Sequence, residues 1–230
     1  MQNQNDARSV AFAPSQERSI GVSTQADKVL RNTYMLLAMT LAFSAITAGV
    51  SMMLNIGFIN PFVTIGIYFG LLFATSKTQD SALGLVFVFA LTGWLGFTLG
   101  PILNVYTATA AGSQLVMTAL AGTAFIFFGL SGFVLVTRKD FSFLTNFIVA
   151  GCIVALLAVV GSLFFNIPGL QLALSCAFLL LSSAIILWQT SNIIHGGETN
   201  YISATVTLYV SLYNIFLSLL QLLSAFGSDD

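Results

Sequence analysis

The chain has 230 residues, of which 57% are hydrophobic and only 7% are charged, against roughly 25% charged residues in a typical soluble domain. A water-soluble fold of this length needs many more polar and charged side chains on its surface, so the sequence predicts an integral membrane protein. The net charge of −1 excludes a nucleic-acid-binding protein, which needs a dense basic face, and one histidine with two cysteines excludes a zinc cluster or a disulfide framework.

The first 28 residues are polar and mixed in charge. Such a segment cannot bury enough apolar surface to order itself, and it lacks the composition of a transit or signal peptide. We expect residues 1–28 to form a flexible cytoplasmic tail and residues 29–230 to form one transmembrane domain. A tail without any role is the alternative.

The remaining charges leave four charge-free intervals, at residues 32–76, 81–137, 141–197 and 199–228. A helical span of a bilayer takes about 20 residues, so these intervals hold two, two, two and one spans. Asn60-Pro61, Gly100-Pro101 and the stretch 166–169 divide the three longer intervals, because proline interrupts or starts a helix. The predicted spans are 32–54, 58–76, 81–99, 114–137, 142–165, 169–192 and 201–226.

The predicted fold class is an all-α integral membrane protein built as a bundle of seven transmembrane helices. Backbone groups that face lipid must be hydrogen-bonded internally, and the long apolar runs do not show the short alternating segments of a β-barrel. With seven spans, every basic residue falls on the side of the amino terminus: Arg8, Arg18, Lys28, Arg31, Lys77, Arg138 and Lys139. The positive-inside rule then predicts a cytoplasmic amino terminus and an external carboxyl terminus.

No arrangement of residues in the sequence indicates an enzyme, a metal site or a cofactor site. His195 is the only histidine, and it lies near Glu198 in a short connection with two glycines. A pair of this kind can bind a metal or transfer protons, but a glycine-rich turn at a helix end explains the same residues more simply. No aspartate or glutamate lies inside a predicted span, so paired acids for intramembrane proteolysis are excluded.

Two helices carry ordered small or polar residues. The last predicted span has polar residues at spacings of three and four, which place them on one face: Asn200, Ser203, Thr207, Ser211, Asn214, Ser218 and Gln221. We favour helix packing over a permeation path for this stripe, because it has no charged ion-binding group. On the third span, Gly93, Gly96 and Gly100 predict a close helix contact.

Three segments resemble the Bax inhibitor-1 family. They are Val29–Tyr34 at the start of the first span, Thr137–Phe143 between the fourth and fifth spans, and Gly197–Ile202 leading into Leu208–Leu217. The resemblance covers essentially everything after the tail, and the last segment is its most specific part. It implies a bundle of seven helices with the last helix in the centre.

The resemblance also implies a function as a pH-sensitive leak pathway for calcium, other cations or protons. In the wider family such a pathway is gated by two aspartates, and the motifs place these positions at Gln189 and Ser211. Neither residue is acidic here, so gating by a carboxylate proton cannot operate at these positions. Gln189 and Ser211 are the candidate functional polar cluster, together with the stripe on the last span.

The segment from Thr190 to Phe216 is closer still to a bacterial inner-membrane branch of the family. That branch implies binding and modulation of the membrane-anchored AAA protease FtsH, with its associated HflK–HflC complex. A flexible tail is a handle that an ATP-driven protease can grip, while a packed bundle resists extraction. The resulting hypothesis is a slow, competing substrate of FtsH; the leak pathway is the second hypothesis, and a passive structural membrane protein is the third.

Overall fold

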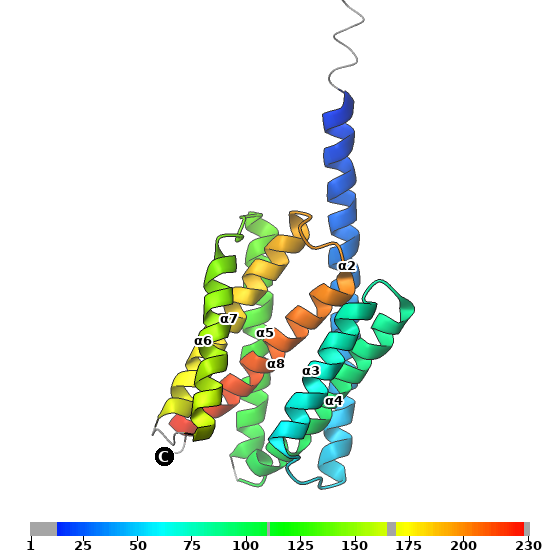
Figure 1. Cartoon of the computed structure of the whole chain (residues 1–230). Coiled ribbons are helices and arrows are strands. Elements are labelled where there is room, and N and C mark those ends of the chain that lie inside the picture. The colour runs from blue at the N-terminus through cyan, green and yellow to red at the C-terminus, as the bar shows by residue number, and fades with distance from the viewer. Residues whose placement is uncertain (1–12, 110, 165–168, 228–230) are drawn as a thin grey trace, which may run out of the picture.

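The computed structural model describes the backbone of residues 13–109, 111–164 and 169–227. Within these ranges the regular structure is entirely helical and contains no strand, which confirms the all-α prediction. The seven helices carry the labels of Figure 1: α2 (Ala13–Met53), α3 (Pro61–Thr78), α4 (Ala82–Thr107), α5 (Gly112–Thr137), α6 (Leu144–Phe164), α7 (Leu170–Ile194) and α8 (Tyr201–Phe226).

Six of the described helices are long and apolar enough to cross a membrane. They are α4, α5, α7 and α8 in full, with Gln25–Met53 of α2 and Leu144–Ser162 of α6. Helix α3, which has 18 residues and carries Lys77 in its last turn, is not among them. The structure therefore shows a multi-pass α-helical architecture, and the seventh span, at residues 58–76, stays a prediction.

Asparagine residues begin two of the helices. Asn200 precedes α8, and its side-chain oxygen accepts the backbone N–H groups of Ile202 at 2.9 Å and Ser203 at 3.2 Å. The predicted span 201–226 coincides with α8. Asn60 caps α3 by accepting the N–H of Phe62 at 2.9 Å, with proline in the first turn of the helix. In both places the side chain satisfies backbone donors that have no partner within the helix.

The predicted end of the third span at residue 99 is wrong. Helix α4 continues through Gly100 and Pro101 to Thr107. Proline removes one hydrogen bond from a helix, but transmembrane helices tolerate it because neighbouring helices stabilise the interrupted segment. Here Gly100 and Pro101 are both buried, and Gly100 packs against Ser51 of α2. Tertiary packing therefore overrides the local breaker.

Helix α2 begins much earlier than the predicted first span at residue 32. It starts at Ala13, with Pro14 in its first turn, where a missing N–H costs little. The first turns project beyond the other helices (Figure 1). Residues 13–28 are therefore helical, and residues 1–12 lie outside the described part of the chain. The division at residue 28 between a tail and a transmembrane domain stays a prediction.

The connections alternate between the two ends of the bundle (Figure 1). The amino-terminal part of α2, the α3–α4 turn and the α5–α6 and α7–α8 connections lie at one end. We call it the basic end, because its described residues include Lys28, Arg31, Lys77, Arg138 and Lys139. The α2–α3 and α4–α5 connections and the end of α8 lie at the opposite end.

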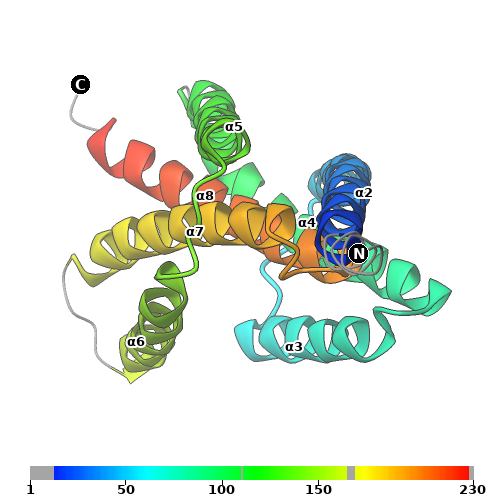
Figure 2. The ribbon, with the colours of Figure 1, turned by 90° about the horizontal axis from the view of Figure 1, so that it is seen from above.

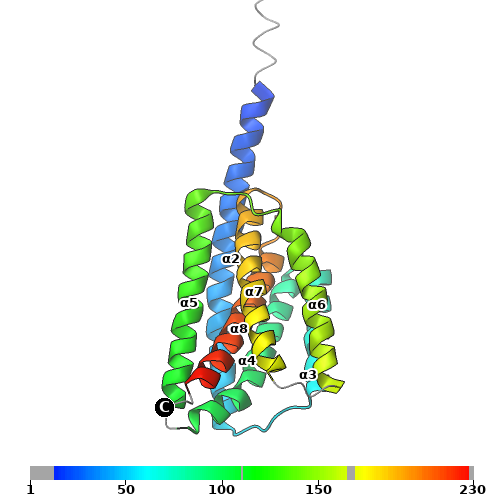
Figure 3. The same cartoon turned by 90° about the vertical axis from the view of Figure 1, so that its left-hand side faces the viewer.

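Helix α8 is the most enclosed of the six apolar helices. Half of its most apolar 18-residue window is buried, against 6% for α6. It packs against α2, α4, α5 and α7, whereas α3 packs on α4 and α6 packs on α7 (Figures 2 and 3). Leu208, Tyr209 and Ser211 point to different sides of α8, and all three are buried. The largest buried cluster combines α8 with residues of α2, α4, α5 and α7.

The close helix contact predicted from glycines on the third span is confirmed. A Cβ added at Gly96 would overlap the backbone oxygen of Ser44 and the hydroxyl of Thr47 on α2, and one added at Gly93 would lie 2.6 Å from the ring of Phe43. The absent side chains let α2 and α4 approach closely, as small residues do in membrane proteins.

Candidate functional site

The connection that contains His195 and Glu198 is a turn between two helices. Helix α7 ends at Ile194, and Gly196 adopts a positive φ of 77° that glycine accepts without strain. Glu198 accepts the N–H of Asn200 at 2.9 Å and the hydroxyl of Ser203 at 3.1 Å, so its carboxylate serves the start of α8. The described residues contain no group of three or more side chains that could hold a metal ion. This geometry supports the interpretation as a turn.

Side-chain hydrogen bonds join the connections at the basic end. Asn200 donates to the Asp80 carboxylate at 2.8 Å and to the Gln79 carbonyl at 3.1 Å, which ties the start of α8 to the α3–α4 turn. Ser191, on α7, accepts the N–H of Phe141 at 3.0 Å and donates to the Lys139 carbonyl at 3.2 Å. The α5–α6 connection is thereby fixed to α7. Because these groups lie far apart in sequence, their bonds hold the helix ends in register.

Asp140, in the α5–α6 connection, has a pKa below its ordinary value. The main cause is the backbone N–H of Ser142, which donates to one carboxylate oxygen at 2.8 Å. The hydroxyl of Ser142 donates to the other oxygen at 3.1 Å, and His195 adds a weaker electrostatic effect in the same direction. The charged carboxylate thus organises the turn that leads into α6.

We expect this turn to loosen at acidic pH. Because the folded-state pKa of Asp140 is lowered, the stability that its carboxylate contributes is complete at neutral pH and is lost as the pH falls through that pKa. An NMR titration that follows the amide proton of Ser142 is expected to give a midpoint below 3.8, the ordinary value for aspartate. The variant Asp140→Asn is the control and should show no such titration. A midpoint at or above the ordinary value would contradict the proposed hydrogen bonds.

The structure buries Gln189 and Ser211, the two residues that the sequence analysis predicts at the family's aspartate positions. Gln189, on α7, is 1% exposed, and Ser211, on α8, is 2% exposed. Ser211 donates to the carbonyl of Thr207 at 2.8 Å, within its own helix. The Nε2 group of Gln189 has no hydrogen-bond partner in the described part of the chain. A buried amide donor without a partner is costly, so this group is a polar feature that packing alone does not explain.

The polar stripe on α8 makes hydrogen bonds both within the helix and with neighbouring segments. Thr207 donates to the carbonyl of Ser203 at 3.1 Å, one turn earlier, and Ser203, Thr207 and Asn214 are half-buried while Ser218 is buried. Gln221 is exposed at the far end, where its side-chain oxygen accepts the hydroxyl of Ser175 on α7. Thr207 and Ser211 therefore use their hydroxyl hydrogens within α8, whereas Ser203 donates to Glu198 in the preceding connection. Among the described residues of the stripe, Asn200 reaches the α3–α4 turn and Gln221 reaches α7.

Tyr209 is a residue that the sequence reasoning missed. Its hydroxyl lies 2.5 Å from the hydroxyl of Ser44 on α2 and donates to the carbonyl of Thr92 on α4 at 3.2 Å. Tyr209 has one hydroxyl hydrogen, so Ser44 is the donor in the first bond. Three helices therefore meet at one buried oxygen. The available signal was a tyrosine within a long apolar run, since a buried tyrosine hydroxyl usually has a partner.

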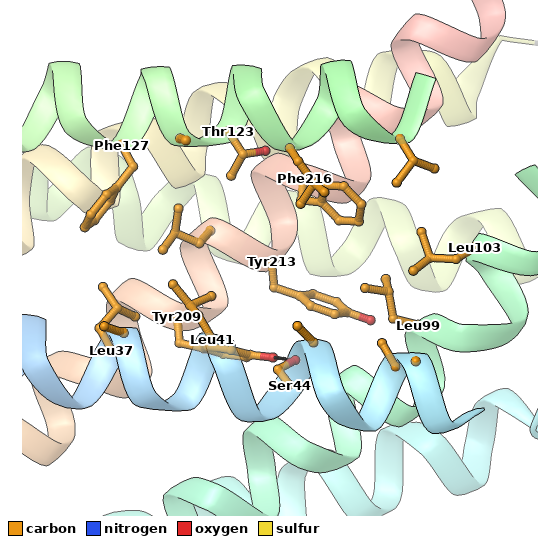
Figure 4. Close-up of a pocket in the computed structure, with 18 of the residues that line it drawn as sticks. Leu37, Leu41, Ser44, Leu99, Leu103, Thr123, Phe127, Tyr209, Tyr213 and Phe216 are labelled. Carbon is orange, nitrogen blue, oxygen red and sulfur yellow. Dashed lines mark hydrogen bonds between the residues drawn. The ribbon is translucent and has the colours of Figure 1, made fainter. Parts of the chain in front are cut away.

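Tyr209 also lines a cavity of about 550 Å³ between α2 and α5 (Figure 4). Its walls are one face of α2 and one face of α5, and its floor comes from α4 and α8. Figure 4 shows Tyr213 between the two walls, with Leu99 and Leu103 of α4 beside it. The lining is almost entirely apolar, and the exceptions include the hydroxyl groups of Ser44, Thr123 and the tyrosines. The sequence did not predict this cavity.

Comparison with known proteins identifies relatives over nearly the whole chain. A protein of Escherichia coli strain K12 named "Modulator of FtsH protease YccA" is 52% identical over 216 residues, which cover 94% of this chain and 97% of the relative. A protein of E. coli O6:H1 with the same identity and coverage is named "Inner membrane protein YccA". An uncharacterised protein of Pseudomonas aeruginosa is 58% identical over 202 residues, covering 88% of this chain and 91% of the relative.

The model of one protein family, described as "Inhibitor of apoptosis-promoting Bax1", matches residues 26–228. The matched range contains all seven described helices except the first turns of α2. Together with the relatives above, it confirms the resemblance seen in the sequence. The chain belongs to the Bax inhibitor-1 family.

Proposed function

We propose that this protein modulates an FtsH-type membrane protease by binding it as a slow, competing substrate. The observation that carries the proposal is the 52% identity, over nearly both full lengths, to the E. coli protein named as a modulator of FtsH. The proposed partners are FtsH and its HflK–HflC complex, in the inner membrane. The protein itself would act as a regulator and not as an enzyme.

The arrangement of α2 supports this mechanism. Its first turns project beyond the other helices at the basic end (Figure 1), so they lie where an ATP-driven protease could engage them. The buried part of the bundle, with α2 packed against α4 and α8, would then oppose extraction. A protease that engages the extension would be occupied for longer than by a loosely packed substrate.

The orientation required for this mechanism is a cytoplasmic basic end. We propose that α3 forms a seventh span, with α8 as the central helix, the amino terminus in the cytoplasm and the carboxyl terminus outside. All seven basic residues then lie on the cytoplasmic side. The contacts of α8 with α2, α4, α5 and α7 support its central place.

Deleting residues 1–20 is expected to lengthen the half-life of this protein several-fold in cells that contain FtsH. The shortened protein should also stop slowing the degradation of a second membrane substrate. Deleting residues 228–230, which follow α8 in the sequence, is the control and should change neither rate. Pulse-chase labelling measures both half-lives, and co-purification in mild detergent tests the complex. Equal half-lives for the shortened and full-length proteins would contradict the mechanism.

A leak pathway for cations or protons is the second candidate function. Its supporting observation is the buried, unpartnered amide of Gln189 on α7, the helix that packs against the hydroxyl-bearing α8. Ion pathways usually contain ionisable groups, and the predicted spans of this chain have no carboxylate. The leak pathway is therefore the second candidate and not the first.

Liposomes that contain the protein should show calcium or proton flux between about pH 6 and 8 if the pathway exists. An absence of flux would exclude the leak pathway.

A further inference from the structure

The cavity between α2 and α5 opens on the outside of the bundle. On α2 its lining extends from Tyr34 to Met52, and on α5 from Val116 to Phe128. At about 1.5 Å per residue, these walls are roughly 27 and 18 Å long. Phe128, which lines the cavity, is 69% exposed, so the cavity is an open groove. Both walls belong to helices that can cross a membrane, and the opening therefore faces lipid.

The groove suits a hydrocarbon chain because it is long and its lining is almost entirely apolar. A chain extended along it would make dispersion contacts at about 4 Å with both walls. The apolar lining offers almost no partner for a polar group, and its opening faces lipid. An acyl chain from the surrounding bilayer is therefore the occupant that we consider.

Charges at the mouth of the groove follow the order of a zwitterionic headgroup. Arg31 and Asp27 lie one and two turns before Tyr34, on the face of α2 that lines the groove. Both side chains are exposed, and neither forms an ion pair with the residues that the structure describes. From the apolar wall toward the amino-terminal end of α2, the first charged group on this face is the Arg31 guanidinium. The Asp27 carboxylate follows about 6 Å further along the helix.

We propose that this groove binds one acyl chain of a phospholipid of the phosphatidylethanolamine class. The phosphate would pair with Arg31, which matches phosphate geometry well, and the ammonium group would lie near Asp27. Inside a bilayer an acyl chain gains no hydrophobic energy by moving from lipid to protein. Selection therefore comes from packing against the groove and from the charges at its mouth. The proposal does not depend on the FtsH function.

Photochemical cross-linking of the full-length protein in vesicles tests the acyl-chain site. The vesicles contain equal amounts of phosphatidylethanolamine and phosphatidylglycerol, and the first carries a photoreactive group in its acyl chain. Mass spectrometry is expected to find cross-links on α2 and α5 within the two walls. Ala124→Phe, an exposed wall residue on α5, should reduce them several-fold. Ala121→Phe, also exposed but outside the lining, is the matched control and should leave them unchanged.

Two variants outside the groove test the headgroup assignment. Arg31→Gln is expected to weaken labelling about fivefold, the effect of one basic residue near a lipid surface. Asp27→Asn should abolish the preference for phosphatidylethanolamine over photoreactive phosphatidylglycerol. Both residues are exposed, so both variants should keep the helical circular dichroism of the parent protein. Even labelling of all helices, undiminished labelling of Ala124→Phe, or cross-links between two copies through α2 and α5 would overturn the proposal.

Discussion

Replacing Gly96 with alanine is expected to lower the free energy of unfolding by about 2–3 kcal/mol, in the upper part of the range for overpacked cores. The added Cβ would overlap the backbone oxygen of Ser44, as well as the hydroxyl groups of Ser44 and Thr47. The hydroxyl groups can rotate, but the backbone oxygen cannot move without displacing α2. The two helices must therefore separate along the contact that holds α2 to α4.

Gly129→Ala provides the matched control for this prediction. Gly129 lies on α5, where an added Cβ would meet nothing within 4 Å. Since alanine favours a helix by about 1 kcal/mol over glycine, the control should be neutral or slightly stabilising. Unfolding in mild detergent against increasing amounts of a denaturing detergent measures both variants. Equal losses of stability in the two variants would contradict the prediction, because any glycine-to-alanine change in these helices would then be destabilising, whatever its contacts.

The sequence was sufficient to predict the helices because charged and polar residues mark most of their ends. The Asn200 side-chain oxygen caps α8, and the predicted and observed bounds of that helix agree. Pro101 misled the prediction, because the local rule for proline ignores the neighbour that supports it. Helix α4 continues through Pro101 because it packs against α2, which is distant from Pro101 in the sequence. The early start of α2 at Ala13 is likewise not marked by any change from polar to apolar residues.

The candidate site was less predictable because it depends on which helices meet. The small residues at Gly93, Gly96 and Gly100 show a close contact without naming the partner, and the structure identifies that partner as α2. The groove needs the separation of α2 and α5, which no pattern within either helix records. Tyr209 entered the sequence analysis only within the family segment Leu208–Leu217, and the partners of its hydroxyl were not predicted.

Replacing Tyr209 with alanine is expected to cost about 3–5 kcal/mol of stability, as for large-to-small changes of buried aromatic residues. The ring is 2% exposed, and its loss would leave a void at the junction of α2, α4 and α8. Tyr209→Phe separates the hydroxyl from the ring and should cost about 1–2 kcal/mol, the range for buried hydrogen bonds between transmembrane helices. Tyr201→Phe on the same helix is the control, because the Tyr201 hydroxyl has no hydrogen bond in the described chain.

A double-mutant cycle of Ser44→Ala and Tyr209→Phe tests whether the hydroxyl pair is a specific link between α2 and α8. If the 2.5 Å contact stabilises the bundle, the two changes together should cost less than the sum of the single changes, with a coupling energy of about 0.5–2 kcal/mol. Additive effects would mean that the two hydroxyl groups are adjacent without stabilising one another. Because Ser44 and Tyr209 both line the groove, a coupled pair would be a stabilising link between its α2 wall and its α8 floor.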